Sequence, residues 1–259
     1  MTFNATLNAE MAALALAATR LAGFVLVAPF PGKGVPNKAK VALILLLAWV
    51  ARATTPAPEG LTLSLALVSL AATELAIGVV IGFTVRITFS CAEVVGGAFA
   101  QATGLQSAQV YDPSLGAEDT VPARIVTIFG MLVFFGLGAH RVALGYLLAS
   151  FQALPIGQEA IPAAAAPSLV DFASQSLGAG VRLALPVTAV ALAVQIALAL
   201  VARASPQIQV FSVGLGLGVA AGLLAILGSI DDVGAGLATE LGREGPRIEQ
   251  VVHEMGRPP

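Results

Sequence analysis

Long apolar runs constrain the fold of this chain more than any other feature of its sequence. Six apolar segments can be drawn, and all but the second reach or approach the roughly 20 residues that a helix needs to cross a bilayer. They cover residues 11–30, 39–51, 61–100, 122–151, 170–202 and 208–230. None alternates polar and apolar residues with the period of two that marks a half-buried strand. The sequence therefore predicts an all-α fold of membrane-type helices.

The composition supports a membrane protein and argues against several functional classes. Only 11% of the 259 residues are charged and the mean hydropathy is +0.89, whereas a soluble domain has roughly 25% charged residues. A net charge of −2 provides no basic footprint for nucleic acid. One cysteine and two histidines do not supply a disulfide framework or a Cys/His metal site, so we expect no cofactor.

Two of the segments are too long to be simple spans. Residues 61–100 would form a helix of roughly 60 Å, about twice the thickness of the hydrocarbon core. We expect this segment to break, to tilt or to leave the bilayer, with Gly78 and Gly82 as candidate helix breaks. Within 170–202, Pro186 lacks a backbone donor and predicts a kink. The expected architecture is a set of broken helical hairpins. The spacing of the two glycines is also typical of close helix contacts, or it arises by chance in a chain with 27 glycines.

The ends of the chain give weaker signals. No basic residue precedes the first segment, which is therefore expected to remain as a helix rather than to be a cleaved signal peptide. Lys33, Lys38 and Lys40 follow it and favour a cytoplasmic side there. From residue 231 onward the chain becomes polar, and we expect a soluble tail at 231–259, helical over 233–242.

Several charged or titratable side chains interrupt the apolar segments or lie near their ends. They are Arg20, Glu74, Arg86, Glu93, His140, Arg182 and Arg203. Five of them lie well within apolar runs, and at about 2.5–3.5 kcal/mol each at a bilayer centre they would together cost on the order of 12–18 kcal/mol. They cannot all face lipid. Three interpretations are open. The charges pair within the chain or with partner subunits, they form an ion or proton relay, or they lie near segment ends and reach the membrane interface. The lone histidine is expected to be structural.

A polar stretch at 101–124 divides the chain near its middle. Its notable residues are Gln106, Ser107, Gln109, Tyr111, Asp112, Pro113, Gly116, Glu118 and Asp119. Pro113 and Gly116 are typical of turns. Irregular backbone cannot face lipid, so this stretch lies in water or lines a wet cavity. Our hypothesis is that it lies in a passage and closes it.

No motif in the sequence indicates an enzyme. Nucleophile elbows, zinc-protease helices, phosphate-binding loops and paired catalytic carboxylates do not occur. A secondary transporter would use Glu74, Arg86 and Glu93 at a broken-helix site, but it would also predict two similar halves, and the sequence shows no convincing repeat. A structural scaffold that does not line a passage is a further alternative.

Short pieces spread over 20–230 resemble the FliR family, also called the T proteins of the type III export apparatus. Their order and spacing carry the resemblance. They include Arg20 to Gly23, Ala28 to Phe30, Val35 to Lys38, Glu74 to Gly78 with Gly82 and Phe83, Gly104, Asp112 with Pro113, Gly138 to His140, Ser150 with Phe151, Leu154 with Pro155, Leu185 with Pro186, and Ala202 to Gln207 with Val210 and Phe211. The chain departs from the family pattern at Gln209 and at 214–218, which lacks a proline and a basic residue.

The resemblance implies a core subunit of a type III protein export gate in the bacterial inner membrane, within the flagellar basal body. Such a chain would form one export-gate domain over 1–230, with a FliP-like portion at about 1–169 and a FliQ-like hairpin at about 170–230, before the polar tail.

The resemblance also implies partners and a role for the polar stretch. The partners would be FliP-like and FliQ-like gate subunits and an FlhB-like export switch protein, and unfolded secreted proteins would be the cargo. The stretch 106–122 would act as a plug, and the segment charges as contacts between subunits. Export energy would come from the proton-motive force and an ATPase elsewhere. Val35 to Asn37 and Asp112 with Pro113 favour the flagellar over the injectisome system.

Overall fold

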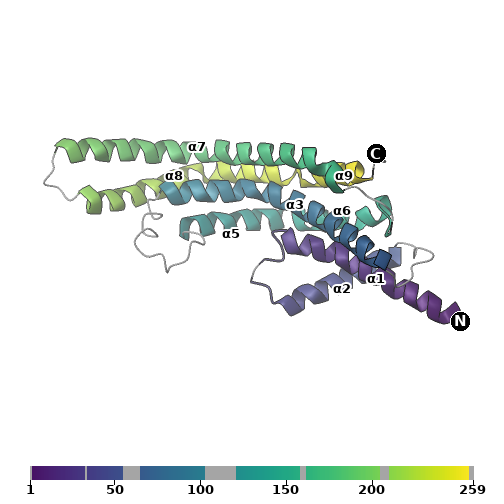
Figure 1. Ribbon diagram of the computed structural model, residues 1–259. Coiled ribbons are helices and arrows are strands. Elements are labelled where there is room, and N and C mark those ends of the chain that lie inside the picture. The colour runs from purple at the N-terminus through teal and green to yellow at the C-terminus, as the bar shows by residue number, and fades with distance from the viewer. Residues whose placement is uncertain are drawn as a thin grey trace. The chain divides into compact units, whose positions relative to one another are not determined.

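The fold was analysed in a computed structural model that describes residues 2–32, 34–54, 65–102, 121–157, 162–204 and 210–256. All regular structure in these residues is helical, which confirms the predicted all-α class. The helices are α1 (Thr2–Val27), α2 (Asn37–Thr54), α3 (Leu65–Ala102), α5 (Val121–Gly136), α6 (Ala139–Ala153), the 3-10 helix η2 (Pro162–Ala165), α7 (Ala166–Ala204), α8 (Val210–Leu241) and α9 (Glu244–Met255) (Figure 1).

The chain forms two compact units that are each built from separate stretches of sequence. Unit 1 comprises Met1–Thr88, Gly138–Ala173 and Arg243–Pro259, and unit 2 comprises Phe89–Leu137 and Ser174–Gly242. The long helices α3 and α7 each contribute to both units. The predicted division into a FliP-like portion and a FliQ-like hairpin follows chain order and stays a prediction.

In unit 1, α1 crosses α3 with almost no side chain between the two backbones. A Cβ on Gly78 would collide with the carbonyl oxygen of Arg20, and one on Gly82 would lie 2.7 Å from the carbonyl oxygen of Phe24. From the other side, a Cβ on Gly23 would collide with the carbonyl oxygen of Leu75. The glycines expected to break this segment therefore do something else. α3 is helical through both of them, and their missing side chains admit α1.

The segment expected at 122–151 is two helices rather than one. α5 ends at Gly136 and α6 begins at Ala139. Gly138 precedes α6 with a φ of 70°, a left-handed conformation that costs glycine little. Pro186, by contrast, lies inside α7, which is helical on both sides of it.

The end of the chain is more ordered than the predicted polar tail. α8 continues to Leu241, and α9 follows after a two-residue turn. α9 packs on α6 and η2 within unit 1 and buries Ile248, Val251 and Met255. A Cβ on Gly245 would lie 3.0 Å from the ring of Tyr146, so glycine permits this close approach. This helix is part of the fold and not a free extension.

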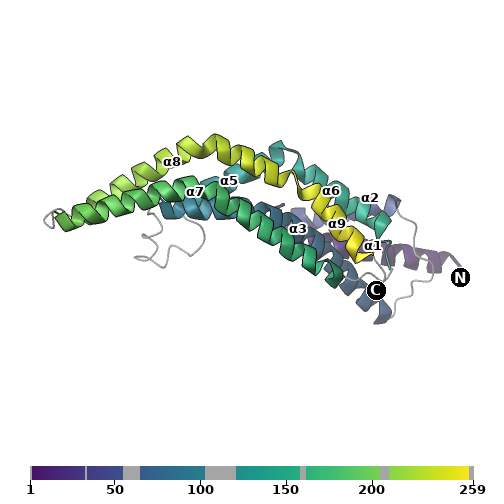
Figure 2. The same ribbon diagram turned by 90° about the horizontal axis from the view of Figure 1, so that it is seen from above.

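In unit 2, α7 and α8 run antiparallel and side by side (Figures 1 and 2). The hydroxyl of Ser176 on α7 donates to Oε1 of Glu240 on α8 at 2.9 Å, and both residues are buried. Leu183 of α7 packs against Gly236 of α8. α5 lies against α8, where the ring of Phe129 meets Gly234. The apolar sequence of 210–230 thus forms part of one arm of a helical hairpin.

Candidate functional site

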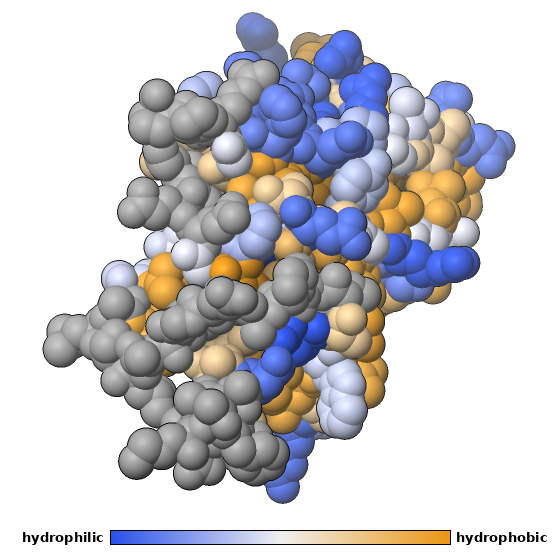
Figure 3. Space-filling view, turned by 90° about the vertical axis from the view of Figure 1, so that its right-hand side faces the viewer, coloured by the Kyte–Doolittle hydropathy of each residue, from blue (hydrophilic) through white to orange (hydrophobic). Residues whose placement is uncertain are grey.

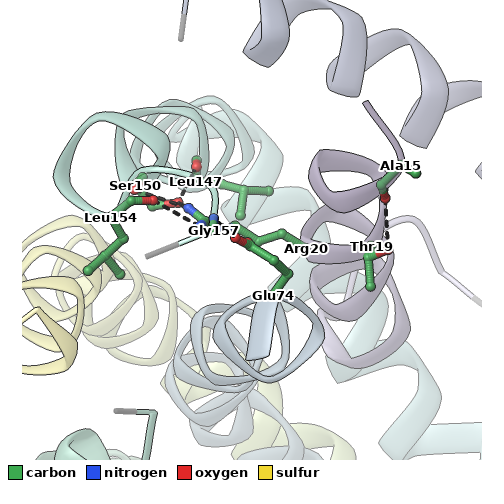
Figure 4. A network of polar contacts seen from close by, with 8 residues as sticks. All are labelled: Ala15, Thr19, Arg20, Glu74, Leu147, Ser150, Leu154 and Gly157. Atoms are coloured by element: carbon green, nitrogen blue, oxygen red, sulfur yellow. Dashed lines mark hydrogen bonds and ion pairs between the residues drawn. The ribbon is translucent and has the colours of Figure 1, made fainter. Parts of the chain in front are cut away.

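Arg20 of α1 is the centre of a buried polar cluster in unit 1. Its side chain is fully buried, and its Nε donates to Oε2 of Glu74 on α3 at 2.6 Å. Nη1 donates to the carbonyl oxygen and the hydroxyl of Ser150 at 3.1 and 3.3 Å, and Nη2 donates to the carbonyl oxygen of Leu154 at 2.9 Å. The guanidinium also lies 4.2 Å from the ring centre of Phe151. All three nitrogens therefore have partners (Figure 4).

The glycine contacts between α1 and α3 explain how this cluster forms. Glu74, Gly78 and Gly82 are four residues apart in turn, so they follow one face of α3. The glycines bring α1 close, and Glu74 then meets Arg20 at the same crossing. Burying an arginine is costly unless its charge is paired and its donors are used. Here the local sequence of both helices meets these two conditions.

The second oxygen of Glu74 holds the turn that follows α6. Oε1 accepts from the backbone N–H of Gly157 at 3.3 Å, and Gly157 has a φ of 84°. We call Arg20, Glu74, Ser150, Phe151, Leu154 and Gly157 the Arg20 cluster. It joins α1, α3 and the end of α6. Arg20 and Glu74 thus pair inside the chain, which was one of the alternatives left open by the sequence, and their contact with a neighbouring subunit stays a prediction.

The cluster gathers residues that the family resemblance already drew attention to. Arg20, Glu74, Ser150, Phe151 and Leu154 come from four separate pieces of that pattern. The sequence analysis singled out only Arg20 and Glu74 as candidate site residues. Ser150 gave no signal of its own, since a serine in an apolar helix commonly bonds to its own backbone. It does so here too, donating to the carbonyl oxygen of Leu147 at 2.6 Å.

α9 brings a second buried arginine to unit 1 that the sequence analysis did not single out. Nη1 of Arg247 donates to the hydroxyl of Thr88 on α3 at 3.1 Å, and the guanidinium lies 5.3 Å from the ring centre of Phe172 on α7. Nearby, Ser168 donates to Oε1 of Glu254 at 2.7 Å and accepts from Gln250 at 3.1 Å. The amphipathic pattern of residues 244–255 was the available signal for a docked helix.

Glu244 at the start of α9 is a different kind of buried acid. Its side chain is buried against α6, near the backbone of Ala143. Neither carboxylate oxygen makes a hydrogen bond of normal geometry with any residue that the structure describes. A buried acid in this state weakens the packing of its own helix.

The other predicted polar residues do not join the Arg20 cluster. Arg86 and Glu93 are exposed on α3, and His140 is half-buried in the first turn of α6. Arg182 is exposed on α7, with Nε donating to its own helix at Gly178, and Arg203 is exposed in the last turn of α7. The predicted plug residues from Gln106 to Asp119 lie outside the described residues.

The helices that flank residues 103–120 are held together in unit 2. Gly130 of α5 lies against the side chain of Ala92 on α3, and the rings of Phe89 and Phe134 meet edge to face at 6.3 Å. Where α3 ends, a hollow of about 60 Å³ is lined by Gln101, Thr188 and Gln195 together with four apolar residues. A small, mainly apolar hollow with three polar side chains therefore lies beside the point at which α3 ends.

Large apolar side chains are exposed along several helices. On α7 six of them form one stripe, since their positions differ by four or seven residues: Leu177, Val181, Leu185, Leu192, Ile196 and Leu200. Others lie on α2, α5 and α8. Figure 3 shows hydrophobic surface, coloured orange, between hydrophilic residues, coloured blue. Such surfaces require lipid or partner subunits.

Four stretches of the described residues are long and apolar enough to cross a membrane. They are Ala9–Val27, Leu67–Ala102, Pro162–Val201 and Gly216–Met255, and the pair Arg124–Gly136 with Ala139–Ala153 would make a fifth. α2 is not among them. The chain therefore has helices that are long and apolar enough to span a membrane. It also has a buried ion pair, Arg20 with Glu74, in the cluster that joins α1, α3 and the end of α6.

Comparison with known proteins identifies relatives of the chain. Residues 11–242 match the model of a family described as bacterial export proteins, family 1. Flagellar biosynthetic protein FliR of Escherichia coli (strain K12) is 28% identical over 155 residues, which cover 60% of this chain and 59% of that protein. The FliR of Aquifex aeolicus (strain VF5) is 29% identical over 176 residues, 67% of this chain and 68% of that protein. The FliR of Bacillus subtilis (strain 168) is 26% identical over 135 residues, 52% of each. The similarity thus spans less than two thirds of the E. coli protein.

Proposed function

Because the chain belongs to the family of bacterial export proteins, family 1, we propose that it is a core subunit of the flagellar type III export gate in the inner membrane. The match over 11–242 carries this proposal, since it covers both sides of the polar stretch. The partners would be FliP-like and FliQ-like gate subunits and an FlhB-like switch protein. The cargo would be unfolded secreted proteins. The chain would do no chemistry of its own.

The exposed apolar stripe of α7 supports a role inside an assembly. Its six large side chains, from Leu177 to Leu200, are each 47–63% exposed. At about 25 cal/mol per Å² of apolar surface, covering such a stripe is strongly favourable. A neighbouring membrane-type helix is the occupant that the family suggests.

The packing of α3 on α5 supports a gating role for the stretch between them. Ala92 and Gly130, which touch, lie ten residues before the end of α3 and nine residues after the start of α5. The two ends that residues 103–120 must join are thus held on a common support. We infer that this stretch closes a passage and is displaced when cargo enters. Its polar residues are compatible with contact with water both when the stretch closes the passage and when it is displaced.

Deleting residues 106–118 tests the plug. The measurement is the leakage of small ions across the inner membrane of cells that carry the assembled complex. We expect leakage to rise in the deletion variant. A second variant replaces the same residues by glycine and serine at unchanged length, which separates the side chains of the plug from the length of the loop.

Unchanged leakage in both variants, with the partner subunits still co-purifying, would contradict the plug. Loss of the partner subunits would instead assign these residues to assembly.

A scaffold that does not line the passage is the main alternative within the same machine. A cross-linker at Gln109 or Tyr111 distinguishes the two. A secreted protein stalled during export should react with these positions if they face the passage, and should not react if the chain only supports its neighbours.

The structure does not favour a secondary transporter. Glu74 is committed to Arg20 and Gly157, and Arg86 is exposed. These two positions are 12 residues apart on α3, or about 18 Å along a helix axis. They do not form one substrate site.

A further inference from the structure

The short helix α2 packs with its small residues inward and its large ones outward. Ala48 and Ala51 are fully buried, whereas Leu46 and Trp49 are 65% and 75% exposed. The outer face of α2 consists of Val41, Leu45, Leu46, Trp49 and Val50. A helix that served only to cover the core of unit 1 would turn these side chains toward it. Such an exposed apolar face is typical of a surface that contacts lipid or a partner.

Basic residues border this face and the helix contains no acid. Lys38 lies on this face at the start of α2 and is exposed, and Arg52 lies near the end of the helix. Lys40 is half-buried on the side of Ala48 and Ala51. Arg52 is already paired, since Nη2 donates to both carboxylate oxygens of Glu10 at 2.8 Å. The net positive charge of the outer face thus comes from its lysine end.

The spacing of these features matches one leaflet of a bilayer. Trp49 lies 11 residues after Lys38 on the same face of α2, about 16 Å along a helix axis. Half of the hydrocarbon core of a bilayer is about 15 Å thick. Beside Trp49, a groove of about 360 Å³ is lined by Met11, Leu14 and Ala53 together with the Glu10–Arg52 pair. It continues the apolar surface at the end opposite to the lysines.

We propose that the outer face of α2 binds anionic phospholipid. The phosphate lies at Lys38, and an acyl chain follows Leu45 and Leu46 to Trp49 and the groove beside it. Lysine at the end of an apolar helix face is the arrangement expected at an anionic membrane surface.

Trp49 reports directly on this surface, because it is the only tryptophan of the chain. The assembled complex is reconstituted into bilayers whose lipids carry bromine on their acyl chains, which quenches tryptophan fluorescence on contact. A complex with Trp49→Phe supplies the background from other subunits. We expect clear quenching of the difference signal. No quenching in the assembled complex would overturn the proposal.

Lys38 is tested by comparing brominated anionic with brominated zwitterionic lipid in mixed bilayers. We expect anionic lipid to quench at lower mole fraction, and Lys38→Gln to reduce this preference by about fivefold. Arg124→Gln, an exposed charge on α5, is the matched control and should leave the preference unchanged. Equal quenching by both lipids in the unaltered complex would contradict the phosphate contact.

A photoreactive residue at position 46 identifies the occupant independently. The buried Cys91 leaves this position free for specific labelling. Lipid adducts support the proposal, whereas an adduct with a partner subunit would overturn it. Export and assembly are measured in the same complexes, so failure of the lipid contact remains distinct from failure of the proposed export function.

Discussion

At the scale of single residues, Arg20 links three segments that are far apart in sequence. Its partners Glu74 and Leu154 are 54 and 134 residues away. We expect Arg20→Gln to lower the free energy of unfolding by about 3–5 kcal/mol, because it leaves the buried carboxylate of Glu74 without its cation. Unfolding of the purified chain in detergent, followed by circular dichroism, measures this.

Arg52→Gln is the matched control for that substitution. It breaks the more exposed ion pair with Glu10, where we expect a loss of no more than about 1 kcal/mol. Replacing Arg20 and Glu74 together by leucine should recover part of the loss, since no lone charge then stays buried. Equal effects of Arg20→Gln and Arg52→Gln would show that the Arg20 cluster does not stabilise unit 1.

Gly78 is the second residue whose effect can be stated in advance. A methyl group there would collide with the backbone of Arg20, which cannot move without shifting α1. We expect Gly78→Ala to destabilise the chain by about 1–3 kcal/mol, as overpacking does. Gly97→Ala on the same helix meets open space in the described part of the chain, and should be neutral or stabilise by up to about 1 kcal/mol through helix propensity. Thermal unfolding of both variants checks the contrast.

At the scale of elements, α9 is docked by its apolar face but carries a buried acid at its first position. We expect Glu244→Gln to tighten the docking of α9 on α6, because a neutral amide costs less to bury than a carboxylate without good hydrogen bonds. Hydrogen exchange of the amides in 248–255 should slow several-fold. Glu249→Gln, at an exposed position of the same helix, keeps a side-chain oxygen to accept the 3.4 Å hydrogen bond from the Tyr146 hydroxyl, and should leave exchange unchanged. Faster exchange in Glu244→Gln would mean that its charge stabilises the docked helix.

At the scale of the whole molecule, exposed apolar helix faces tie the chain to its surroundings. We expect Leu192→Ser with Ile196→Ser to leave the chain folded but to reduce co-purification of partner subunits on the order of tenfold or more, since two large apolar contacts are lost. Val190→Ser is the control, because Val190 is also exposed but points to the opposite side of α7. Undiminished co-purification would place the partners elsewhere.

Much of the fold followed from local pattern, and the exceptions are instructive. The apolar runs predicted helices at α1, α3 and α7, because only helices satisfy every backbone group within one segment in lipid. The break before α6 was missed although Gly138 lies at it, since a single glycine in an apolar run does not announce a left-handed turn. Gly78 and Gly82 were predicted as helix breaks, and their spacing also indicated a close helix contact, but the spacing alone did not reveal that α1 is the helix on the other side.

What the sequence determined by itself was the class of structure and the cost of its charges. Apolar runs of this length must become helices, and an arginine and a glutamate within them must find partners. Only the tertiary structure decided that Arg20 meets Glu74, that Ser150 and Leu154 complete the arginine's hydrogen bonds, and that α9 folds back onto α6. Such pairings depend on which helix faces meet in space, and contacts across more than 50 residues leave no periodic trace in a single sequence.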